Sequence, residues 1–200
     1  MRRRCDPFEW SGGHPALDLV NTLDERPFAA SVENLSSYGD VVRFAELAGL
    51  IEPSLATTLR GRAGSACVRV ARRTRQLREH LFKVLTAAYQ AKPIPQTDLK
   101  AISAAIRAAH SARRLAGAPS AILTAHRWVT GSEVAAPLHA CALAIERLLT
   151  QTERRRIRKC SALDCEVYFI DTSKRGGRRW CSMKNCGNRE KQRRWRLGAH

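Results

Sequence analysis

The sequence lacks the features that mark several common classes of protein. No run of apolar residues approaches the roughly 18 that a membrane-spanning helix requires. The basic start Met1–Arg4 does not lead into the apolar segment of a secretory signal. The chain also contains no phosphate-binding glycine motif, no G-x-S-x-G and no H-E-x-x-H. We therefore expect a cytoplasmic protein that has no catalytic activity and no membrane span.

Acidic residues are scarce relative to basic ones. The 200 residues include 35 Lys and Arg but 18 Asp and Glu, which gives a formal net charge of +17. Residues 151–200 carry fifteen of the basic and five of the acidic residues, so a quarter of the chain holds more than half of the excess. Such an asymmetry indicates a polyanionic partner, with nucleic acid ahead of a membrane surface.

Cysteine carries the clearest chemical pattern in the chain. Four of the seven cysteines form two pairs, with four residues inside each pair and fifteen between the pairs: Cys160, Cys165, Cys181 and Cys186. This spacing is typical of a tetrahedral thiolate site for one zinc ion. Because all four ligands come from the protein, the zinc would be structural and not catalytic. An iron–sulfur cluster and redox-active cysteine pairs are the alternatives.

The residues around these cysteines predict a small β-hairpin followed by a helix. Residues 166–171 are rich in strand formers, residues 172–177 form a turn with two glycines, and Arg178–Trp180 returns as the second strand. Asn188 is expected to cap a helix over residues 189–197. The module has too few apolar residues to fold unaided, so we expect zinc to supply most of its folding free energy.

Basic side chains are dense throughout this module and predict contact with nucleic acid. Arg189, Arg193 and Arg196 recur every three to four residues, a spacing that can follow phosphates and place an arginine at a guanine edge. A solvated basic helix without a partner is the alternative. The full set of expected nucleic-acid contacts is Lys174, Arg175, Arg178, Arg179, Arg189, Lys191, Arg193, Arg194 and Arg196.

The part of the chain before residue 151 predicts a helical domain. Apolar residues recur at helical spacing in three long stretches, residues 68–90, 98–114 and 134–150. Asp40 is expected to cap a further helix that ends at Gly49. Residues 121–129 fit either a strand or a poor helix.

A change in composition near residue 151 divides the chain into two expected domains, residues 1–150 and residues 151–200. In the first domain, His14, Asp18 and Asn21 lie at or near a short helix that follows Pro15. They are candidates for a small-molecule pocket. Hydrogen bonding to neighbouring loops is the alternative role for the polar residues of that helix.

The sequence around the last cysteine pair resembles a known family. The segment RRWCSMKNCGNREKQRRWR is similar to the signature of the CGNR zinc finger, whose name is spelled by Cys186–Arg189. The earlier cysteine pair, and Tyr168–Phe169 leading to Asp171, match it as well. Residues 12–22, GGHPALDLVNT, look like the start of the ABATE domain. The resemblance implies a bacterial, stress-related transcription regulator with a treble-clef-like finger that binds DNA and holds zinc on the same four cysteines.

Together these observations predict a mainly α protein, with an N-terminal helical domain followed by a small zinc-bound β-hairpin-plus-helix module. We expect the module to bind DNA at the nucleoid, and the helical domain to form a homodimer or to sense an unknown small-molecule effector. RNA binding is one alternative, with Trp180, Trp195 and Tyr168 as stacking surfaces. A protein-interaction module that meets an acidic partner is another.

Overall fold

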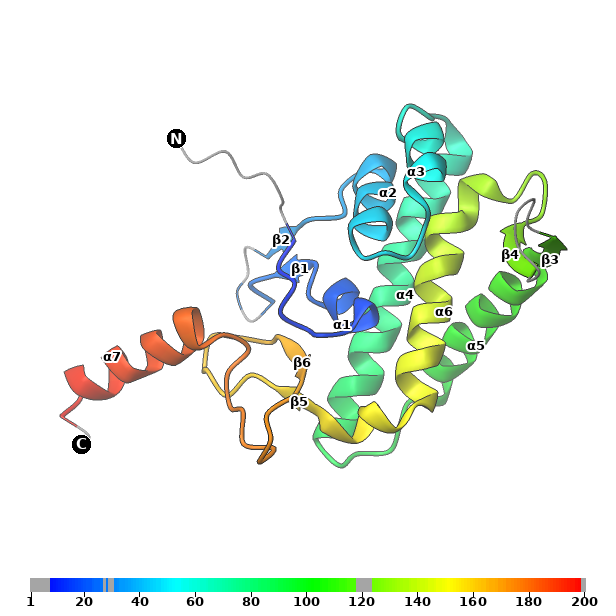
Figure 1. Ribbon diagram of the computed structural model, residues 1–200. Helices are drawn as coiled ribbons and strands as arrows, with labels where there is room; N and C mark the ends of the chain where they lie inside the picture. The colour runs from blue at the N-terminus through cyan, green and yellow to red at the C-terminus, as the bar shows by residue number, and fades with distance from the viewer. Residues whose placement is uncertain (1–7, 27, 29–30, 118–123, 199–200) are drawn as a thin grey trace. The chain divides into compact units, whose positions relative to one another are not determined.

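The computed structural model describes residues 8–26, 28, 31–117 and 124–198 (Figure 1). They fall into two compact units. One unit spans Leu35–Arg147, and the other combines the described residues up to Asn34 with those from Leu148 onward. The expected division at residue 151 follows composition, whereas these units follow spatial contact. The described residues before Leu35 therefore belong to the same unit as the four clustered cysteines.

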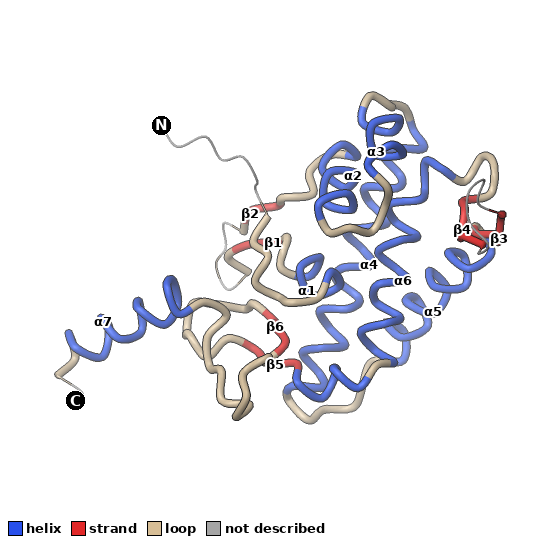
Figure 2. Tube along the Cα trace, viewed as in Figure 1, coloured by secondary structure: helices blue, strands red, loops and turns tan. Residues whose placement is uncertain are grey.

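The unit spanning Leu35–Arg147 is mainly helical, as the colouring in Figure 2 shows. Leu81, Ile102 and Ile145 are among its fully buried core side chains. The mainly α architecture predicted from apolar periodicity is confirmed. No helix among the described residues is long and apolar enough to cross a membrane. The helices are α2 (Tyr38–Leu47), α3 (Pro53–Arg60), α4 (Ser65–Tyr89), α5 (Gln96–Ser111), the 3-10 helix η1 (Glu133–Ala135) and α6 (Ala136–Thr150), whose last turn extends into the other unit.

Helix α2 begins with a capping box. The Ser37 hydroxyl accepts a hydrogen bond from the Asp40 backbone N–H at 3.2 Å, and the Ser37 backbone N–H donates to the Asp40 carboxylate at 2.8 Å. The sequence-based assignment of Asp40 as the N-cap is therefore wrong, because Asp40 is the third helical residue and Ser37 is the cap. The reciprocal pair satisfies two backbone N–H groups that a helix start otherwise leaves without partners.

A hairpin follows α5 where the sequence predicted three further helical residues. Strand β3 (Arg113–Gly117) pairs antiparallel with β4 (Thr124–Trp128). The hydrogen bond from the Val129 N–H to the Ala112 carbonyl, 2.8 Å long, continues this pairing. Helix α5 therefore ends at Ser111, and the strand alternative is correct for residues 124–128. Of the rest of the ambiguous segment, Val129 follows the strand and residues 121–123 lie outside the described residues.

The second unit is built around short elements from both ends of the chain. Strands β5 (Ile157–Lys159) and β6 (Tyr168–Ile170) pair antiparallel, with Ile157 opposite Ile170. The predicted return strand Arg178–Trp180 is wrong: these residues form no strand, because the Arg178 N–H donates to the Asp171 carboxylate at 3.0 Å. The elements of this unit are α1 (Pro15–Val20), β1 (Leu23–Asp24), β2 (Val32–Glu33), the 3-10 helix η2 (Thr152–Arg156), β5 (Ile157–Lys159), β6 (Tyr168–Ile170), the π-helical turn η3 (Met183–Gly187) and α7 (Asn188–Arg196).

Helix α7 continues directly from the π-helical turn η3. Asn188 is its first residue and Gly187 occupies the cap position, so the predicted capping role of Asn188 is wrong. The Asn188 side chain instead donates to the Lys184 carbonyl at 3.2 Å. Since η3 already supplies backbone carbonyls at the helix start, α7 needs no side-chain cap there.

Helix α1 and the turn before it are hydrogen-bonded to β6. The Asn21 side chain donates to the Tyr168 carbonyl at 2.9 Å and accepts from the Tyr168 N–H at 3.1 Å. Two residues further along the strand, the Ile170 N–H donates to the Gly12 carbonyl at 2.8 Å. The N-terminal segment thus provides hydrogen-bond partners for one edge of β6, while β5 pairs along its other edge.

Candidate metal centre

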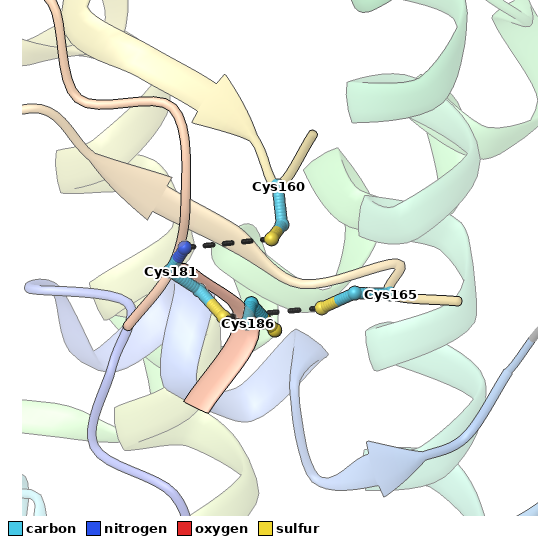
Figure 3. A group of neighbouring side chains, drawn as sticks. All are labelled: Cys160, Cys165, Cys181 and Cys186. Atoms are coloured by element: carbon cyan, nitrogen blue, oxygen red, sulfur yellow. Dashed lines mark hydrogen bonds between the residues drawn. The ribbon is translucent and has the colours of Figure 1, made fainter. Parts of the chain in front are cut away.

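Four cysteines from separate stretches of the second unit converge on one point (Figure 3). Cys160 follows β5, Cys165 lies in the loop before β6, Cys181 follows the turn after β6, and Cys186 lies in η3. All four Sγ atoms lie within 4.8 Å of one another. Cys165 is partly exposed and the other three are buried. The pairing of β5 with β6 closes the loop that holds both cysteines of the first pair.

The spacing of the sulfur atoms fits a tetrahedral zinc site. The Sγ of Cys181 lies 3.8 Å from that of Cys165 and 3.5 Å from that of Cys186. Ligands on a tetrahedron with Zn–S bonds of about 2.3 Å are about 3.8 Å apart, whereas a disulfide bond is about 2.05 Å long. All four thiols are free of disulfide bonds. Four sulfur ligands leave no open coordination position, so the site holds one structural zinc ion.

Electrostatics explains why these thiols need a cation to ionise together. Hydrogen bonds from Cys165 and Cys181 lower the pKa of the Cys160 thiol, whereas the hydrogen bond with Cys160 raises the pKa of Cys165. The same contact raises the pKa of Cys181, and burial raises the pKa of Cys186. One thiolate is thus stabilised at the expense of its neighbours. Zinc binding must therefore release protons and weaken as the pH falls.

Groups around the sulfur atoms donate hydrogen bonds to them. The Cys181 backbone N–H lies 3.5 Å from the Cys160 Sγ, and the Arg189 guanidinium lies 3.3 Å from the Cys186 Sγ. Arg189 also forms an ion pair with Asp164 at 2.8 Å. Such outer partners orient metal ligands and offset the negative charge of the thiolates. Sequence reasoning assigned Arg189 to nucleic acid and missed Asp164, because no local pattern links residues 25 positions apart.

A carboxylate holds the turn between β6 and the second cysteine pair. Asp171 accepts hydrogen bonds from the Ser173 hydroxyl at 2.6 Å, from the Ser173 N–H at 2.9 Å and from the Arg178 N–H at 3.0 Å. These bonds, led by that of the Ser173 hydroxyl, lower the pKa of Asp171. Sequence reasoning missed this role, although an Asp followed by Thr, Ser and a glycine pair is a turn signal that could have revealed it.

The side chain of Arg178 points back into the module. Its guanidinium donates to the carbonyls of Trp180, at 3.0 Å, and of Cys181. It also lies over the Phe169 ring, 4.2 Å from the ring centroid. Phe169 belongs to the buried cluster that contains Cys160, Cys181 and Cys186. Arg178, an expected nucleic-acid contact, is thus a packing residue of the metal centre.

The other expected nucleic-acid contacts divide by whether they have partners within the chain. On α7, Arg189 and Arg193 face Asp164, with Arg193 at 4.0 Å from it and 3.4 Å from Glu190. Arg179 lies over the Trp180 ring, 5.2 Å from its centroid. The remaining residues are exposed and form no ion pair with any residue in the described part of the chain: Lys174, Arg175, Lys191, Arg194 and Arg196.

The three residues proposed for a small-molecule pocket each form hydrogen bonds with the protein backbone. His14 caps α1 through Nδ1, which accepts from the Ala16 N–H at 3.2 Å. The buried Asp18 carboxylate accepts from the Gly12 N–H at 2.8 Å, and burial raises the pKa of Asp18 to about 6 against the opposing effect of this bond. Asn21 is bonded to Tyr168. These contacts fit the alternative role given above, in which the polar residues form hydrogen bonds with neighbouring segments.

A cavity of about 370 Å³ lies beside the cysteines in the same unit. Residues 23–26 line one side of it, Cys165, Cys181 and Cys186 line another, and Asn21 also contributes. Burial raises the pKa of Glu9, another lining residue, and the nearby Asp24 raises it further. His14 and Asp18 do not line this cavity. Through it, the partly exposed Cys165 can be reached from solvent.

Comparison with protein families matches nearly the whole chain. A family described as ABATE, "Putative stress-induced transcription regulator", matches residues 13–152, and the CGNR zinc finger matches residues 156–197. A search of curated proteins found no match to the chain. The ABATE match covers more than half of the residues, and the finger match contains all four cysteines. This chain therefore belongs to the ABATE family and carries a CGNR zinc finger after its ABATE domain.

Proposed function

We propose that this protein is a zinc-dependent, DNA-binding transcription regulator without catalytic activity, acting in the cytoplasm at the nucleoid. The observation that carries the proposal is the set of exposed basic side chains on the zinc-bound module that have no acidic partner among the described residues. Residues 151–200 carry a net charge of +10. Unpaired positive charges at such a surface favour the binding of a polyanion such as DNA.

Helix α7 presents two chemically different faces. Arg189 and Arg193, four residues apart, share the face that meets Asp164. Lys191 and Arg194 lie on the opposite face, where Trp195 is 74% exposed. Lys191 and Arg194 on the second face remain available to phosphate oxygens, and so does Arg196 near the end of the helix. We therefore assign DNA contact to Lys191 and Arg194, joined by Lys174 and Arg175 of the exposed turn, ahead of Arg189 and Arg193.

In this proposal zinc holds the basic residues of the module in position and does not contact the DNA. The four thiolates hold the loops around β6 together through the metal. Helix α7 begins at Asn188, two residues after the ligand Cys186. Loss of the metal would therefore disperse the basic residues. The DNA affinity should depend on zinc even though no base contacts the ion.

The test compares two variants of equal charge change in the full-length, zinc-loaded protein. Binding to duplex DNA, first selected from a random pool, is measured at several salt concentrations. Lys191→Ala combined with Arg194→Ala should weaken binding and reduce the slope of log K against log salt by about two. The control, Lys100→Ala combined with Arg107→Ala, removes two exposed charges from α5 in the other unit and should change neither quantity. Equal affinities for the two variants would contradict the assignment.

RNA binding is the second candidate, and one observation favours it. Trp195 is exposed beside Arg194, an arrangement that suits stacking on an unpaired base. Tyr168, the other predicted stacking residue, is 1% exposed, and Trp180 packs against the buried cysteine cluster. Competition between duplex DNA and single-stranded RNA at fixed salt separates the two functions. Trp195→Ala should weaken RNA binding far more than duplex binding if RNA is the natural partner.

A further inference from the structure

The helical unit contains a cleft of about 290 Å³ between α4, α5 and α6. Along α5 the cleft is lined by Ala101, Ala104, Ala105 and Ala108. These positions follow the spacing i, i+3, i+4 and i+7, so they form one stripe on the helix. All of them carry the smallest side chain that has a Cβ, and the space that larger residues would fill stays open. The cleft lies inside the segment that matches the ABATE family.

The opposite wall has the same helical spacing but a different chemistry. It consists of Arg73, Gln76, Leu77 and His80 on α4, again at i, i+3, i+4 and i+7. Leu77 provides an apolar surface, and Leu138 of α6 extends it. Polar groups stand on both sides of Leu77 along the stripe. The cleft therefore combines an apolar interior with a few hydrogen-bonding groups, which is the usual composition of a small-molecule site.

Arg73 supplies a fixed positive charge at this wall. Within the described part of the chain it forms no ion pair and no side-chain hydrogen bond. Most other charged groups near the cleft are already paired: Asp98 is buried and accepts from His80 Nδ1 at 2.7 Å, with Lys83 at 3.8 Å. The Asp98 contact occupies Nδ1 and leaves Nε2 as the remaining polar atom of the His80 ring.

The second histidine of the cleft adds a neutral hydrogen-bonding group. His139 of α6 stacks on Trp128, with ring centroids 5.9 Å apart and an interplanar angle of 27°. Burial, and then the positive charge of Arg73, lower the pKa of His139. Its ring is therefore uncharged at neutral pH, and the stacking fixes its orientation. Arg73 and His139 both line the cleft, so a ligand there can meet the guanidinium and the ring together.

We propose that this cleft binds a small organic anion, with its carboxylate on Arg73 and its apolar body against the alanine stripe, Leu77 and Leu138. An arginine fork pairs with a carboxylate through two parallel N–H···O bonds, which an amide or alcohol does not reproduce. The volume is at the lower limit of typical ligand pockets, so the ligand has on the order of ten to fifteen non-hydrogen atoms. The site needs neither zinc nor nucleic acid, so this proposal can be tested independently of the proposed DNA binding.

The first experiment is isothermal titration of the full-length zinc-loaded protein, without nucleic acid, with benzoate and 1-naphthoate. Benzamide and 1-naphthamide serve as neutral ligands of nearly the same shape. At least one carboxylate should bind at least about tenfold more tightly than its amide, because a charge-assisted hydrogen bond replaces a neutral one. Absence of binding by both carboxylates, or equal binding by acid and amide, would overturn the proposal.

Variants then locate the binding to the cleft. Arg73→Gln should lower the affinity for the better carboxylate about tenfold or more, whereas Arg72→Gln, which removes an exposed charge on the same helix outside the cleft, should leave it unchanged. Ala104→Leu should abolish binding by filling the cleft, and Ser103→Leu, exposed on α5 and outside the cleft, should not. Because positions 103 and 104 are both exposed, neither leucine overpacks the core. Similar losses for Arg72→Gln and Arg73→Gln would refute the site.

Discussion

The side-chain amide of Asn21 forms two hydrogen bonds with the backbone of Tyr168, donating to its carbonyl at 2.9 Å and accepting from its N–H at 3.1 Å. The amide thus pairs with β6 as a neighbouring strand would. Asn21 is 4% exposed and Tyr168 is 1% exposed, so water cannot replace either bond. This contact makes a residue of the ABATE match part of the framework around the zinc ligands.

Replacement of Asn21 should therefore destabilise the zinc-bound module. Asn21→Ala leaves a buried N–H and a buried carbonyl without partners, and each such group costs about 1 to 3 kcal/mol. We expect a lower melting temperature and faster transfer of zinc to a chelator. Asn185→Ala is the matched control, because the Asn185 side chain is exposed and forms no hydrogen bond within the described residues. Equal zinc-release rates for the two variants would show that the Asn21 contact does not support the metal centre.

Two glycines should respond very differently to alanine. A Cβ at Gly12 would lie 2.8 Å from the Leu17 Cβ and 2.9 Å from the Asp18 backbone nitrogen, neither of which can move without shifting α1. A Cβ at Gly187 would meet the end of the Met183 side chain at 2.6 Å, and Met183 is 49% exposed and free to adopt another rotamer. Gly12→Ala should cost about 1 to 3 kcal/mol of stability and Gly187→Ala less than about 1 kcal/mol. Melting temperatures of the zinc-loaded variants test this order, and a reversed order would disprove it.

The buried Asp18 should make stability depend on pH. Burial raises its pKa from 3.8 to about 6, so the folded protein binds a proton more tightly than the unfolded chain does. This contribution to stability is complete below pH 4 and is lost as the pH rises through 6. Asp18→Asn keeps an oxygen acceptor for the Gly12 N–H and removes the buried charge, so it should stabilise the protein at pH 7.5 by at most about 3 kcal/mol.

The difference between Asp18→Asn and wild type, measured by urea unfolding, should shrink as the pH falls from 7.5 towards 5. Comparing the two proteins at each pH cancels the loss of zinc in acid, which affects both. A difference that stays constant over this range would show that Asp18 does not titrate with a raised pKa in the folded protein.

Arg189 and Arg194 should have separable effects on zinc. The Arg189 guanidinium contacts the Cys186 Sγ and Asp164, whereas Arg194 is exposed without an ion pair in the described chain. Arg189→Ala should weaken zinc binding about tenfold or more, because loss of a group that supports a metal ligand typically has an effect of that size. Arg194→Ala should leave it unchanged. A chelator competition assay measures both, and similar affinities would argue against a supporting role for Arg189.

The same pair explains how a DNA-binding defect should be interpreted. A loss of DNA affinity in Arg189→Ala would combine a changed metal site with a lost surface charge. A loss in Arg194→Ala would report the surface alone. Zinc content must therefore be measured in every finger variant before its DNA binding is compared with that of the wild type.

Local patterns in the sequence predicted the zinc site and the long helices well. Two cysteine pairs with four residues inside each indicate a thiolate site whatever the surrounding fold, because ligand spacing reflects the geometry of the metal. Apolar periodicity located α4, α5 and α6 to within a few residues at each end. Both signals are local, since each depends on residues a short distance apart in the chain.

Contacts between residues far apart in the sequence were not predicted. The hairpin was predicted between residues 166–171 and Arg178–Trp180, but β6 pairs with β5, which precedes the first cysteine. Either segment could pair with a strand of Tyr168–Ile170. In the structure β5 occupies one edge of that strand, the N-terminal segment bonds to the other, and the Arg178 N–H is bonded to Asp171. The roles of Arg178 and Arg189 were missed for a related reason. An arginine that contacts a partner at the surface and an arginine that contacts groups inside the module look the same in the sequence.

The sequence by itself determined the mainly α composition, the four zinc ligands and the concentration of positive charge near them. Only the tertiary structure decided that the N-terminal segment and the finger share one unit, through hydrogen bonds between residues 147 positions apart. It also decided that Arg189 pairs with Asp164 and with the sulfur of Cys186. In the other unit, it placed Arg73 and the alanines of α5 around the same cleft. Composition and spacing encode what a chain can bind, whereas partner choice among equivalent groups depends on packing in three dimensions.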